Sequence, residues 1–495
     1  MTEPGLPHFD VIIVGGGLSG VDAAYHLQTY CPRKSYVILE ARDAIGGTWD
    51  LFRYPGIRSD SDMYTFGYSF RPWQANAAIA DGASIRTYIR DTAETYGIDR
   101  KICFGHRVKR ASWSSATAQW TIEAERGSGG KPVSFTCDFL LGCTGYYDYV
   151  EGYTPAFPGA DNFRGRFIHP QHWPEDLDYA DKRVVVIGSG ATAVTIVPAI
   201  AERAAHVTML QRSPTYVVSR PSQDALAKWL RRRLPTRTAY GLARWYNVLF
   251  GLYFYNLSRR KPQAVKNWIV KQAQLQLGPD YDVKTHFTPR YNPWDQRLCL
   301  APDGDFFQAI KSGRAEIITD EIDAFTESGI RLRSGGEIAA DIVVTATGLK
   351  LKLLGGIDIA VDGRPVDFAE TMNFRGVMFS DVPNLAAVFG YTNASWTLKC
   401  DLTCAYVARL IKHMDRHDYA ACTPRQRDLS IRSEPLIDFS SGYIQRAIDQ
   451  FPRQGSKKPW RLYQNYVRDL FSLRFGAVGD KAIEFTRRAD VKAAA

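Results

Sequence analysis

The sequence predicts an α/β protein with two parallel sheets, and two glycine-rich turns support this fold class most directly. A GxGxxG pattern at residues 15–20 follows the mostly apolar run 9–14, and a GxGxxA pattern at 188–193 follows the apolar run 184–187. Such glycines permit a tight turn from strand to helix, and the N-terminus of that helix binds a pyrophosphate. We therefore expect two Rossmann-like dinucleotide-binding domains.

The residues that follow the two turns differ in charge. Glu40 lies 20 residues beyond the first turn, where a carboxylate hydrogen-bonds a free ribose 2′-OH and repels a 2′-phosphate. Arg212 lies 19 residues beyond the second turn and is followed by Ser213, and an arginine at this place accommodates a 2′-phosphate. The sequence therefore predicts that the first domain binds FAD and the second binds NADPH, as in a flavoenzyme.

A repeated strand pattern indicates that one domain is inserted in the other. Residues 138–145 (DFLLGCTG) and 341–348 (DIVVTATG) share an acidic residue, an apolar stretch and a final Thr-Gly, and each is typical of a late buried strand. We expect an FAD-binding domain at 1–155 and 345–495, an NADPH-binding domain at 156–220 and 285–344, and a basic helical insert at 221–284.

Composition and cysteine spacing narrow the class of protein. The 495 residues are 45% hydrophobic, which suits a globular chain of two or three domains. Nothing at the N-terminus resembles a signal peptide, and the apolar stretch 245–258 is too short to span a bilayer, so we expect a cytoplasmic protein. The eight cysteines show no CxxC or zinc spacing, so we expect reduced thiols, no metal and no dithiol mechanism. Cys400 and Cys404 have the spacing of one helix face.

The excess of positive charge is concentrated in residues 224–277, which hold eleven basic residues and one acidic residue. No nucleic-acid-binding motif accompanies them, so we expect no nucleic-acid partner. The segment is also rich in Trp, Tyr and Phe. A helix with a basic face and an aromatic face has two interpretations here: a cover over the active site that attracts NADPH, or peripheral contact with a membrane.

A longer motif, FxGxxxHxxxWP, occupies residues 163–174 between the two turns. Together with GGTW at 46–49 and YPGIRSD at 54–60, it resembles the fingerprint of the type I (class B) flavoprotein Baeyer–Villiger monooxygenases. The stretches YNPWDQR at 291–297 and GYTNASW at 390–396 are similar to the subgroup that includes the ethionamide-activating monooxygenase.

This resemblance implies an enzyme that uses FAD, NADPH and O2 to convert small apolar ketones to esters or lactones through a flavin C4a-peroxide. Sulfides and thioamides are further implied substrates. One alternative is a flavin-containing monooxygenase limited to N- and S-oxygenation. Another is an NADPH-dependent flavin reductase or redox-responsive binding protein. Trp173 favours the Baeyer–Villiger branch, because related flavin-containing monooxygenases have Phe or Tyr at this position.

The resemblance also implies roles for single residues. Arg297 matches the family's active-site arginine, a fixed cation that stabilises the charge of the adduct between peroxide and ketone; a loop arginine paired with Asp295 is the alternative. Asp60 is implied to lie near the flavin and orient Arg297, or else is a turn residue. His169 fits a hydrogen-bonding hinge better than an acid or base. The residues implied to couple domain movement to catalysis are Phe163, Gly165, His169 and Trp173.

The turns and the resemblance together predict the cofactor contacts. For FAD these are Gly15, Gly17, Ser19, Gly20, Glu40, Thr48, Trp49, Asp50, Leu51, Asp60 and Val108. For NADPH they are Gly188, Ser189, Gly190, Ala191, Thr192, Ala193, Val194, Arg212 and Ser213, with Arg58, Ser59 and Asp60 near the nicotinamide. Gln296 stands where many family members have a lysine that binds the 2′-phosphate, so we expect NADPH selectivity to depend more on Arg212.

Overall fold

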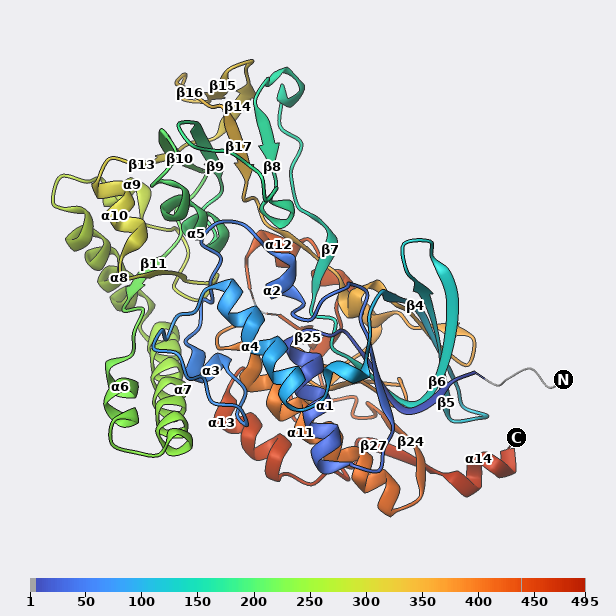
Figure 1. Cartoon of the computed structure of the whole chain (residues 1–495). Coiled ribbons are helices and arrows are strands. Elements are labelled where there is room, and N and C mark those ends of the chain that lie inside the picture. The colour runs from blue at the N-terminus through green and yellow to red at the C-terminus, as the bar shows by residue number, and fades with distance from the viewer. Residues whose placement is uncertain (1–5, 438, 495) are drawn as a thin grey trace.

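The computed structural model describes residues 6–437 and 439–494, which form two sheet-containing units and a set of helices on one side (Figure 1). In the first unit, β1 (His8–Val14) lies between two parallel neighbours, β2 (Tyr36–Leu39) and β6 (Lys131–Gly142). Val11, Ile12 and Ile13 are at most 1% exposed. A strand with successive buried apolar residues is covered on both faces, as in other parallel sheets.

The first sheet draws on two distant parts of the chain. Its parallel part is completed by β3 (Ile102–Cys103) beside β2 and by β23 (Leu385–Ala387) beside β6. An antiparallel extension continues from β6. Its strands are β5 (Gln119–Arg126), β4 (His106–Ser114), β19 (Asp358–Val361) and β20 (Arg364–Pro365), with β4 and β19 parallel to each other.

The second sheet is parallel throughout. In the sequence, all of its strands lie between the two segments that form the first sheet. Its strands, in spatial order, are β13 (Ala315–Thr319), β10 (His206–Gln211), β9 (Arg183–Ile187), β17 (Ile342–Thr345) and β8 (Arg166–Ile168). The antiparallel strands beside it are β14 (Ile322–Phe325), β15 (Gly329–Leu332) and β16 (Glu337–Ala339). The predicted fold class is confirmed: two Rossmann-like units, the second inserted in the first, and a helical insert. The proposed domain boundaries stay a prediction.

The two repeated sequence patterns occupy equivalent places. β6 contains most of the first pattern and lies beside β1, while β17 contains half of the second and lies beside β9. Each chain crossing between the units follows one of these strands. The crossings pair with each other as the antiparallel strands β7 (Tyr147–Gly152) and β18 (Leu349–Leu351).

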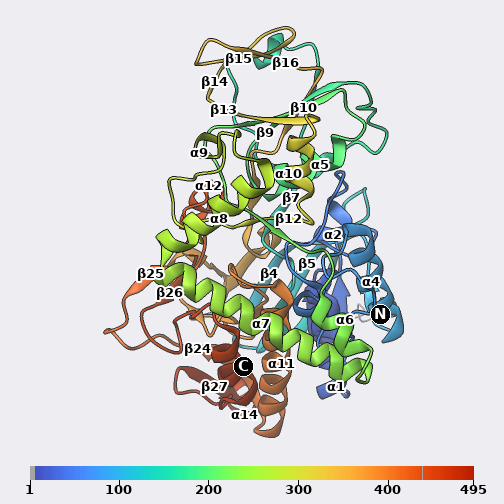
Figure 2. The same cartoon turned by 90° about the vertical axis from the view of Figure 1, so that its left-hand side faces the viewer.

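Helices cover the sheets and form the insert. In the first unit, α1 (Leu18–Tyr30) packs against α11 (Trp396–Arg416). In the second unit, α5 (Ala191–Ile200) begins at the second glycine turn. The insert consists of α6 (Ala225–Arg231), α7 (Thr236–Arg260) and α8 (Pro262–Leu277), which lie across the front of the molecule in Figure 2. Other helices are α2 (Thr48–Leu51), α3 (Met63–Phe66), α4 (Gly82–Thr95), α9 (Val283–His286), α10 (Asp305–Lys311), α12 (Gly442–Gln445), α13 (Tyr466–Asp469) and α14 (Arg488–Ala494).

The remaining short strands are β11 (Val217–Arg220), β12 (Cys299–Pro302), β21 (Asn373–Phe374), β22 (Met378–Phe379), β24 (Tyr419–Pro424), β25 (Ser433–Pro435), β26 (Arg453–Gly455) and β27 (Ile483–Arg487). Within the described residues, no helix combines the length and the apolar composition needed to cross a membrane. All eight cysteines are free thiols, as the sequence predicts.

Candidate active site

The first glycine turn leaves no room for side chains. Gly15 has φ +109°, and a Cβ atom there would lie 2.5 Å from the carbonyl oxygen of Cys143. A Cβ on Gly20 would lie 1.9 Å from the carbonyl oxygen of Gly15. Gly17 precedes α1, and no side chain caps the N-terminus of this helix. Its free N–H groups are therefore available to a pyrophosphate.

Glu40 directly follows β2 and is held against the turn. Its carboxylate accepts hydrogen bonds from the backbone N–H groups of Gly16 at 2.5 Å and Arg42 at 2.8 Å. Burial raises the pKa of Glu40, while the two N–H groups act to lower it. A carboxylate offers about four acceptor positions, and the two backbone N–H groups use one on each oxygen.

The second glycine turn resembles the first in its backbone, but it has more open space around its second glycine. Gly188 has φ +127°, and a Cβ there would lie 2.3 Å from the carbonyl oxygen of Ala346. A Cβ on Gly190 would have no protein atom within 4 Å. No side chain caps α5, which begins after Gly190. The glycine at 188 is thus required by the protein, whereas space beside Gly190 suits an approaching ligand.

Arg212 and Ser213 follow β10 at the same edge of the sheet. The hydroxyl of Ser189 donates to the carbonyl oxygen of Ser213 at 3.0 Å, which holds this segment beside the turn. The side chain of Arg212 is exposed and makes no hydrogen bond or ion pair with any residue that the structure describes. Of the remaining predicted NADPH contacts, Ala191 and Thr192 are partly exposed, while Ala193 and Val194 are fully buried.

The other predicted FAD contacts lie around the first turn. Trp396 donates from Nε1 to the hydroxyl of Ser19 at 2.9 Å, and Thr48 hydrogen-bonds Tyr149 at 3.1 Å. Trp49 packs edge-on against Phe66. Asp50, Leu51 and Val108 are buried, whereas Asp60 is exposed. The carboxylate of Asp50 forms ion pairs with Arg42, Arg53 and Arg86.

Arg297 lies among tyrosines near the chain crossings. Its Nη2 donates to the hydroxyl of Tyr146 at 3.4 Å, and its Nε is buried with no hydrogen-bond partner among the described residues. Tyr146 raises the pKa of Arg297 above its ordinary range, and Tyr443, Tyr147 and Asp60 act in the same direction against desolvation. Arg297 is therefore a cation held among tyrosines, and its buried Nε–H has no partner among the described residues. Asp295 does not pair with it, since that carboxylate binds Arg259 at 2.9 Å.

The loop that carries Asp60 presses against the second unit. A Cβ on Gly56 would lie 2.6 Å from the Cβ of Ala199 on α5. Desolvation by the surrounding protein raises the pKa of Asp60, although the side chain remains accessible to solvent, while Arg297 and Arg58 act to lower it. Asp60 and Arg297 interact through charge, and no ion pair joins them among the described residues.

The neighbours of Asp60 have partners of their own. Arg58 binds the carboxylate of Asp305 at 2.5 Å and the carbonyl oxygen of Leu300 at 3.3 Å. The hydroxyl of Ser59 donates to the carbonyl oxygen of Ser61 at 2.7 Å. Arg58 thus spans the two units, since Asp305 begins α10, whereas Ser59 stabilises its own turn.

His169 lies where the two chain crossings meet. Its Nε2 donates to the carbonyl oxygen of Gly348 at 3.2 Å, and its Nδ1 accepts from the N–H of Gln171 at 3.2 Å. A Cβ on Gly152 would lie 1.9 Å from the imidazole ring. Burial lowers the pKa of His169, which favours the neutral ring. Both crossings therefore contact one uncharged histidine.

The other residues of this motif support that position. Phe163 is buried and packs against Phe325, and a Cβ on Gly165 would lie 2.4 Å from both the Phe163 ring and the carbonyl oxygen of Asp341. Trp173 packs edge-on against Tyr179. The whole motif is thus packed against the second sheet, with His169 as its contact to the crossings.

Comparison with known proteins agrees with this arrangement. Residues 66–351 match the family described as flavin-binding monooxygenase-like, and residues 13–76 match the NAD(P)-binding Rossmann-like domain. The FAD-containing monooxygenase EthA from Mycobacterium tuberculosis is 53% identical over 489 residues, 99% of each chain. The chain belongs to the flavin-binding monooxygenase-like family. The expectation of an FAD-dependent monooxygenase is confirmed, and so is the resemblance to the subgroup that contains EthA.

Solved structures share the fold of this family member. A steroid monooxygenase bound to NADP matches with a TM-score of 0.75 at 21% identity, covering 97% of this chain and 100% of that one. The complex of OTEMO with FAD and NADP matches with a TM-score of 0.75 at 19% identity and the same coverage. At these identities the likeness concerns the two-unit fold.

Four aromatic residues were not predicted as site residues: Tyr146, Tyr147 and Tyr443 near Arg297, and Trp396 beside Tyr146. Tyr146 and Trp396 lie 5.2 Å apart between ring centroids, and Trp396 binds Ser19 in the first glycine turn. Burial raises the pKa of Tyr443 to about 12. Three of the four carried a signal in the sequence, because Tyr146 and Tyr147 directly follow the first Thr-Gly pattern and Trp396 ends the GYTNASW stretch. Tyr443 is far from every motif.

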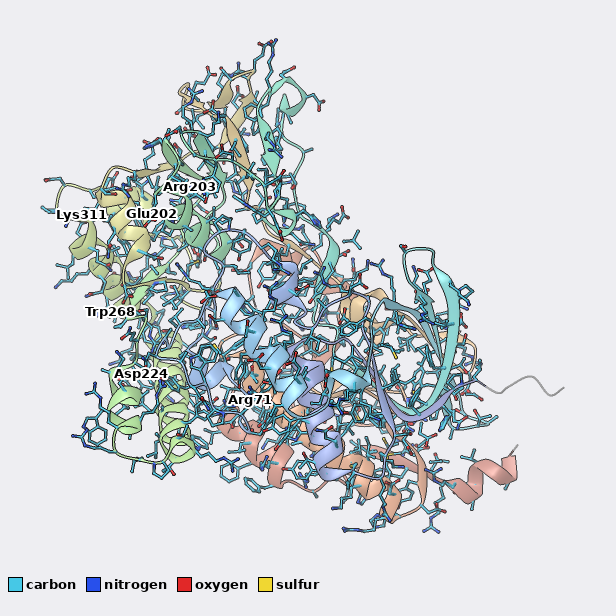
Figure 3. All side chains as sticks on the ribbon, viewed as in Figure 1. Arg71, Glu202, Arg203, Asp224, Trp268 and Lys311 are labelled. Carbon is cyan, nitrogen blue, oxygen red and sulfur yellow. The ribbon has the colours of Figure 1, made fainter. Side chains whose placement is uncertain are left out.

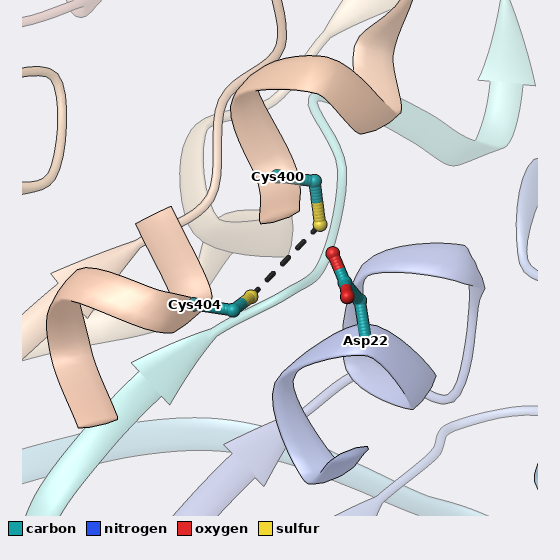
Figure 4. Close-up of side chains that lie close together, drawn as sticks. All are labelled: Asp22, Cys400 and Cys404. Atoms are coloured by element: carbon teal, nitrogen blue, oxygen red, sulfur yellow. Dashed lines mark hydrogen bonds between the residues drawn. The ribbon is translucent and has the colours of Figure 1, made fainter. Parts of the chain in front are cut away.

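A second polar group is buried behind the site, between α1 and α11. Asp22, Cys400 and Cys404 point toward one another (Figure 4), and the two sulfur atoms lie 4.0 Å apart. Burial raises the pKa of both thiols, that of Cys404 to about 12. His26 binds Asp401 at 3.1 Å and lies 3.5 Å from Asp22. The group thus contains an ion pair and one carboxyl with no hydrogen-bond partner in the described residues.

The Asp22 carboxyl should make stability pH-dependent. Burial raises its pKa to about 7, against the lowering charge of His26. An unfolded carboxyl releases its proton near pH 4, so the folded state loses stability as pH rises from about 4 to 7. Asp22→Asn removes this loss, and its free energy of unfolding relative to the parent should increase from pH 5 to 8, by at most about 1.4 kcal/mol per pH unit. Urea unfolding checks this. The exposed Asp176→Asn variant should follow the parent at every pH, and an Asp22→Asn curve parallel to it would contradict the assignment.

Proposed function

We propose that this protein is a Baeyer–Villiger monooxygenase that converts apolar ketones to esters or lactones and also oxygenates the sulfur of sulfides and thioamides. The observation that carries the proposal is Arg297, a fixed cation with a buried and unpartnered Nε–H. Heteroatom oxygenation alone requires no cation for a carbonyl oxygen. A reductase would require neither this cation nor the linked motifs at 54–60 and 163–174.

The cofactors of the proposed reaction are FAD and NADPH, and the two turns fit them. The uncapped N-terminus of α1 and the carboxylate of Glu40 suit the pyrophosphate and ribose of FAD. The uncapped N-terminus of α5, the space beside Gly190 and the exposed Arg212 suit a dinucleotide with a 2′-phosphate. When bound, FAD reduced by NADPH supplies the activation of O2.

The protein's own residues then bind, orient and stabilise. Arg297 would donate from its guanidinium to the ketone oxygen, where negative charge develops, and a preorganised donor acts there without reorganisation. Tyr146 holds the guanidinium by its hydrogen bond. Asp60 contributes negative charge near Arg297 and would keep its orientation. Trp396 connects this group to the turn that would hold the FAD pyrophosphate.

The motif at 163–174 would couple movement of the second unit to catalysis. His169 hydrogen-bonds one crossing at Gly348 and packs on the other at Gly152. Gln171 also donates to the carbonyl oxygen of Asp148 at 2.9 Å. A rotation of the second unit would therefore also move the two crossings that the motif contacts. Arg58, bound to Asp305 of that unit, would respond to the same rotation.

Arg212→Ala should raise the KM for NADPH by tenfold or more and change the KM for NADH little. The reason is that only NADPH carries the 2′-phosphate, and one arginine–phosphate interaction is worth about 1.5–3 kcal/mol. Steady-state kinetics with both coenzymes measures this. Arg203→Ala removes another surface arginine, from a segment without predicted contact to the coenzyme, and should change neither KM. Equal effects of Arg212→Ala on the two coenzymes would contradict its assignment to the 2′-phosphate.

Isotope-labelled dioxygen tests the proposed function directly. The purified protein is given NADPH, labelled O2 and one of three substrates: a medium-chain linear ketone, a cyclic ketone or an aryl methyl sulfide. An ester or lactone with a single labelled oxygen, detected by mass spectrometry, supports the proposal. Labelled sulfoxide without any ester would favour the heteroatom oxygenase. Oxidation of NADPH with peroxide as the sole product would favour the reductase.

A further inference from the structure

The insert presents an exposed apolar face to solvent. Of the 17 large hydrophobic side chains exposed among the described residues, nine lie on α6, α7 and α8. Figure 2 shows these helices across the front of the molecule, and Figure 3 shows Trp268 of α8 on its outer edge. We call these nine residues the outer face: Trp229, Leu242, Trp245, Tyr246, Leu249, Phe250, Tyr253, Trp268 and Leu275.

Helix α7 has two apolar sides, and the core uses only one. Tyr240, Ala243 and Val248 are buried and repeat with helical spacing. Leu242, Leu249 and Tyr253 repeat with the same spacing on the opposite side and are 48%, 55% and 65% exposed. A helix with one buried stripe normally has a polar opposite side. The second stripe therefore indicates a partner outside the described fold.

The charge around this face has one sign. Residues 225–277 contain eleven basic residues and no acidic residue. Arg232, Arg260, Lys261 and Lys271 are exposed, and none of them forms a hydrogen bond or ion pair with the described part of the chain. An exposed apolar surface surrounded by free positive charges suits an anionic surface with an apolar interior.

We propose that the outer face binds the surface of an anionic phospholipid bilayer, with α7 parallel to the membrane plane. Trp and Tyr are the side chains that favour the boundary between headgroups and hydrocarbon, and leucines can enter the acyl region. The basic residues attract anionic headgroups. A second copy of this chain fits less well, because the exposed positive charges of the two faces, among them Arg232, Arg260, Lys261 and Lys271, would repel each other. Nucleic acid explains the charge but not the exposed leucines.

Bilayer binding would bring the membrane close to the candidate active site. Arg259, at the end of α7, forms an ion pair with Asp295, two residues from Arg297. The ring of Tyr255 on α7 lies 5.6 Å from that of Trp294. An apolar substrate dissolved in the bilayer would thus reach the loop that carries Arg297. The binding itself does not depend on the proposed chemistry.

Vesicle flotation of the full-length protein tests the proposal. Vesicles of phosphatidylcholine with phosphatidylglycerol should carry the protein upward, and vesicles of phosphatidylcholine alone should carry much less. Added salt should weaken binding, and Arg260→Gln with Lys261→Gln should weaken it about fivefold for each charge removed. Leu249→Gln with Tyr253→Gln should reduce it at least as strongly, since glutamine keeps helix propensity but cannot enter hydrocarbon.

A matched variant, Leu6→Gln with Leu429→Gln, removes two leucines that are exposed elsewhere and should float like the parent. Thermal unfolding confirms that each variant is folded. Protein that stays with the dense fraction in both vesicle types overturns the proposal. So does flotation that is unchanged by the Leu249 and Tyr253 substitutions. Self-association lost in that double variant, without flotation of the parent, would assign the face to a second copy. Salt-sensitive binding to DNA without flotation would assign it to nucleic acid.

Discussion

Arg297→Ala is expected to lower the rate of ester formation from a ketone by about 10²–10³-fold. The guanidinium is the one cation with a buried, unpartnered N–H that the described residues place among Tyr146, Tyr147 and Tyr443. Its loss leaves the charge on the ketone oxygen without a preorganised donor. Reduction of the flavin by NADPH precedes this step and should stay nearly unchanged. Stopped-flow absorbance measures the reduction, and chromatography measures the ester.

The exposed Arg290 supplies the matched control, because it lies in the same loop and its side chain points to solvent. Arg290→Ala should form ester at the parental rate. Arg297→Lys keeps the charge but not the planar pair of donors, so it should recover only part of the activity. If Arg297→Ala turns over ketones like the parent, the role given to this arginine is wrong.

Gly190→Ala is expected to raise the KM for NADPH by tenfold or more, about 1.4 kcal/mol of binding free energy. The second glycine of this turn lets the backbone approach the pyrophosphate. A Cβ there meets no protein atom within 4 Å, so the methyl group would occupy space needed by the coenzyme and not by the fold. The flavin content and the melting temperature should therefore stay at parental values while coenzyme binding weakens. Steady-state kinetics, absorbance and calorimetry measure the three quantities.

Substitutions of two other glycines serve as controls for this prediction. Gly188→Ala places a Cβ 2.3 Å from the Ala346 carbonyl oxygen at φ +127°, so it should lower the melting temperature. Gly241→Ala adds a methyl group to α7 where no atom outside the helix's own backbone lies within 4 Å, so it should raise stability by about 0.5–1 kcal/mol through helix propensity and leave KM close to the parental value. A Gly190→Ala variant that unfolds like the first, or binds NADPH like the second, would contradict the argument.

Local sequence patterns predict the two Rossmann-like units and their glycine turns well. The glycine turns, the acidic Glu40 and the basic Arg212 each depend on residues near one strand end, where spacing is fixed by strand and helix lengths. The repeated patterns that end in Thr-Gly likewise predict equivalent strands in two sheets, because buried parallel strands have a recognisable composition. The helical spacing of Cys400 and Cys404 is confirmed by α11.

Contacts between distant segments could not be predicted in the same way. Tyr443 reaches the neighbourhood of Arg297 from 146 residues away, and Asp50 is occupied by three arginines that no local pattern assigns to it. The two apolar stripes of α7 are both visible in the sequence, but only the packing decides which one is buried. Asp60 and Arg297 show the intermediate case, since the resemblance implied proximity and the structure adds that no ion pair joins them.

During translation, the whole second unit is synthesised before the last strands of the first unit. The last strand of the second sheet ends at Thr345, whereas β23, which covers the edge of β6 at residues 140–142, begins at Leu385. Chains usually fold from the N-terminus as they emerge. Here the order is expected to reverse. Residues 166–345 should fold first, and the sheet that contains β1, β2 and β6 should be completed only after β23 has been synthesised.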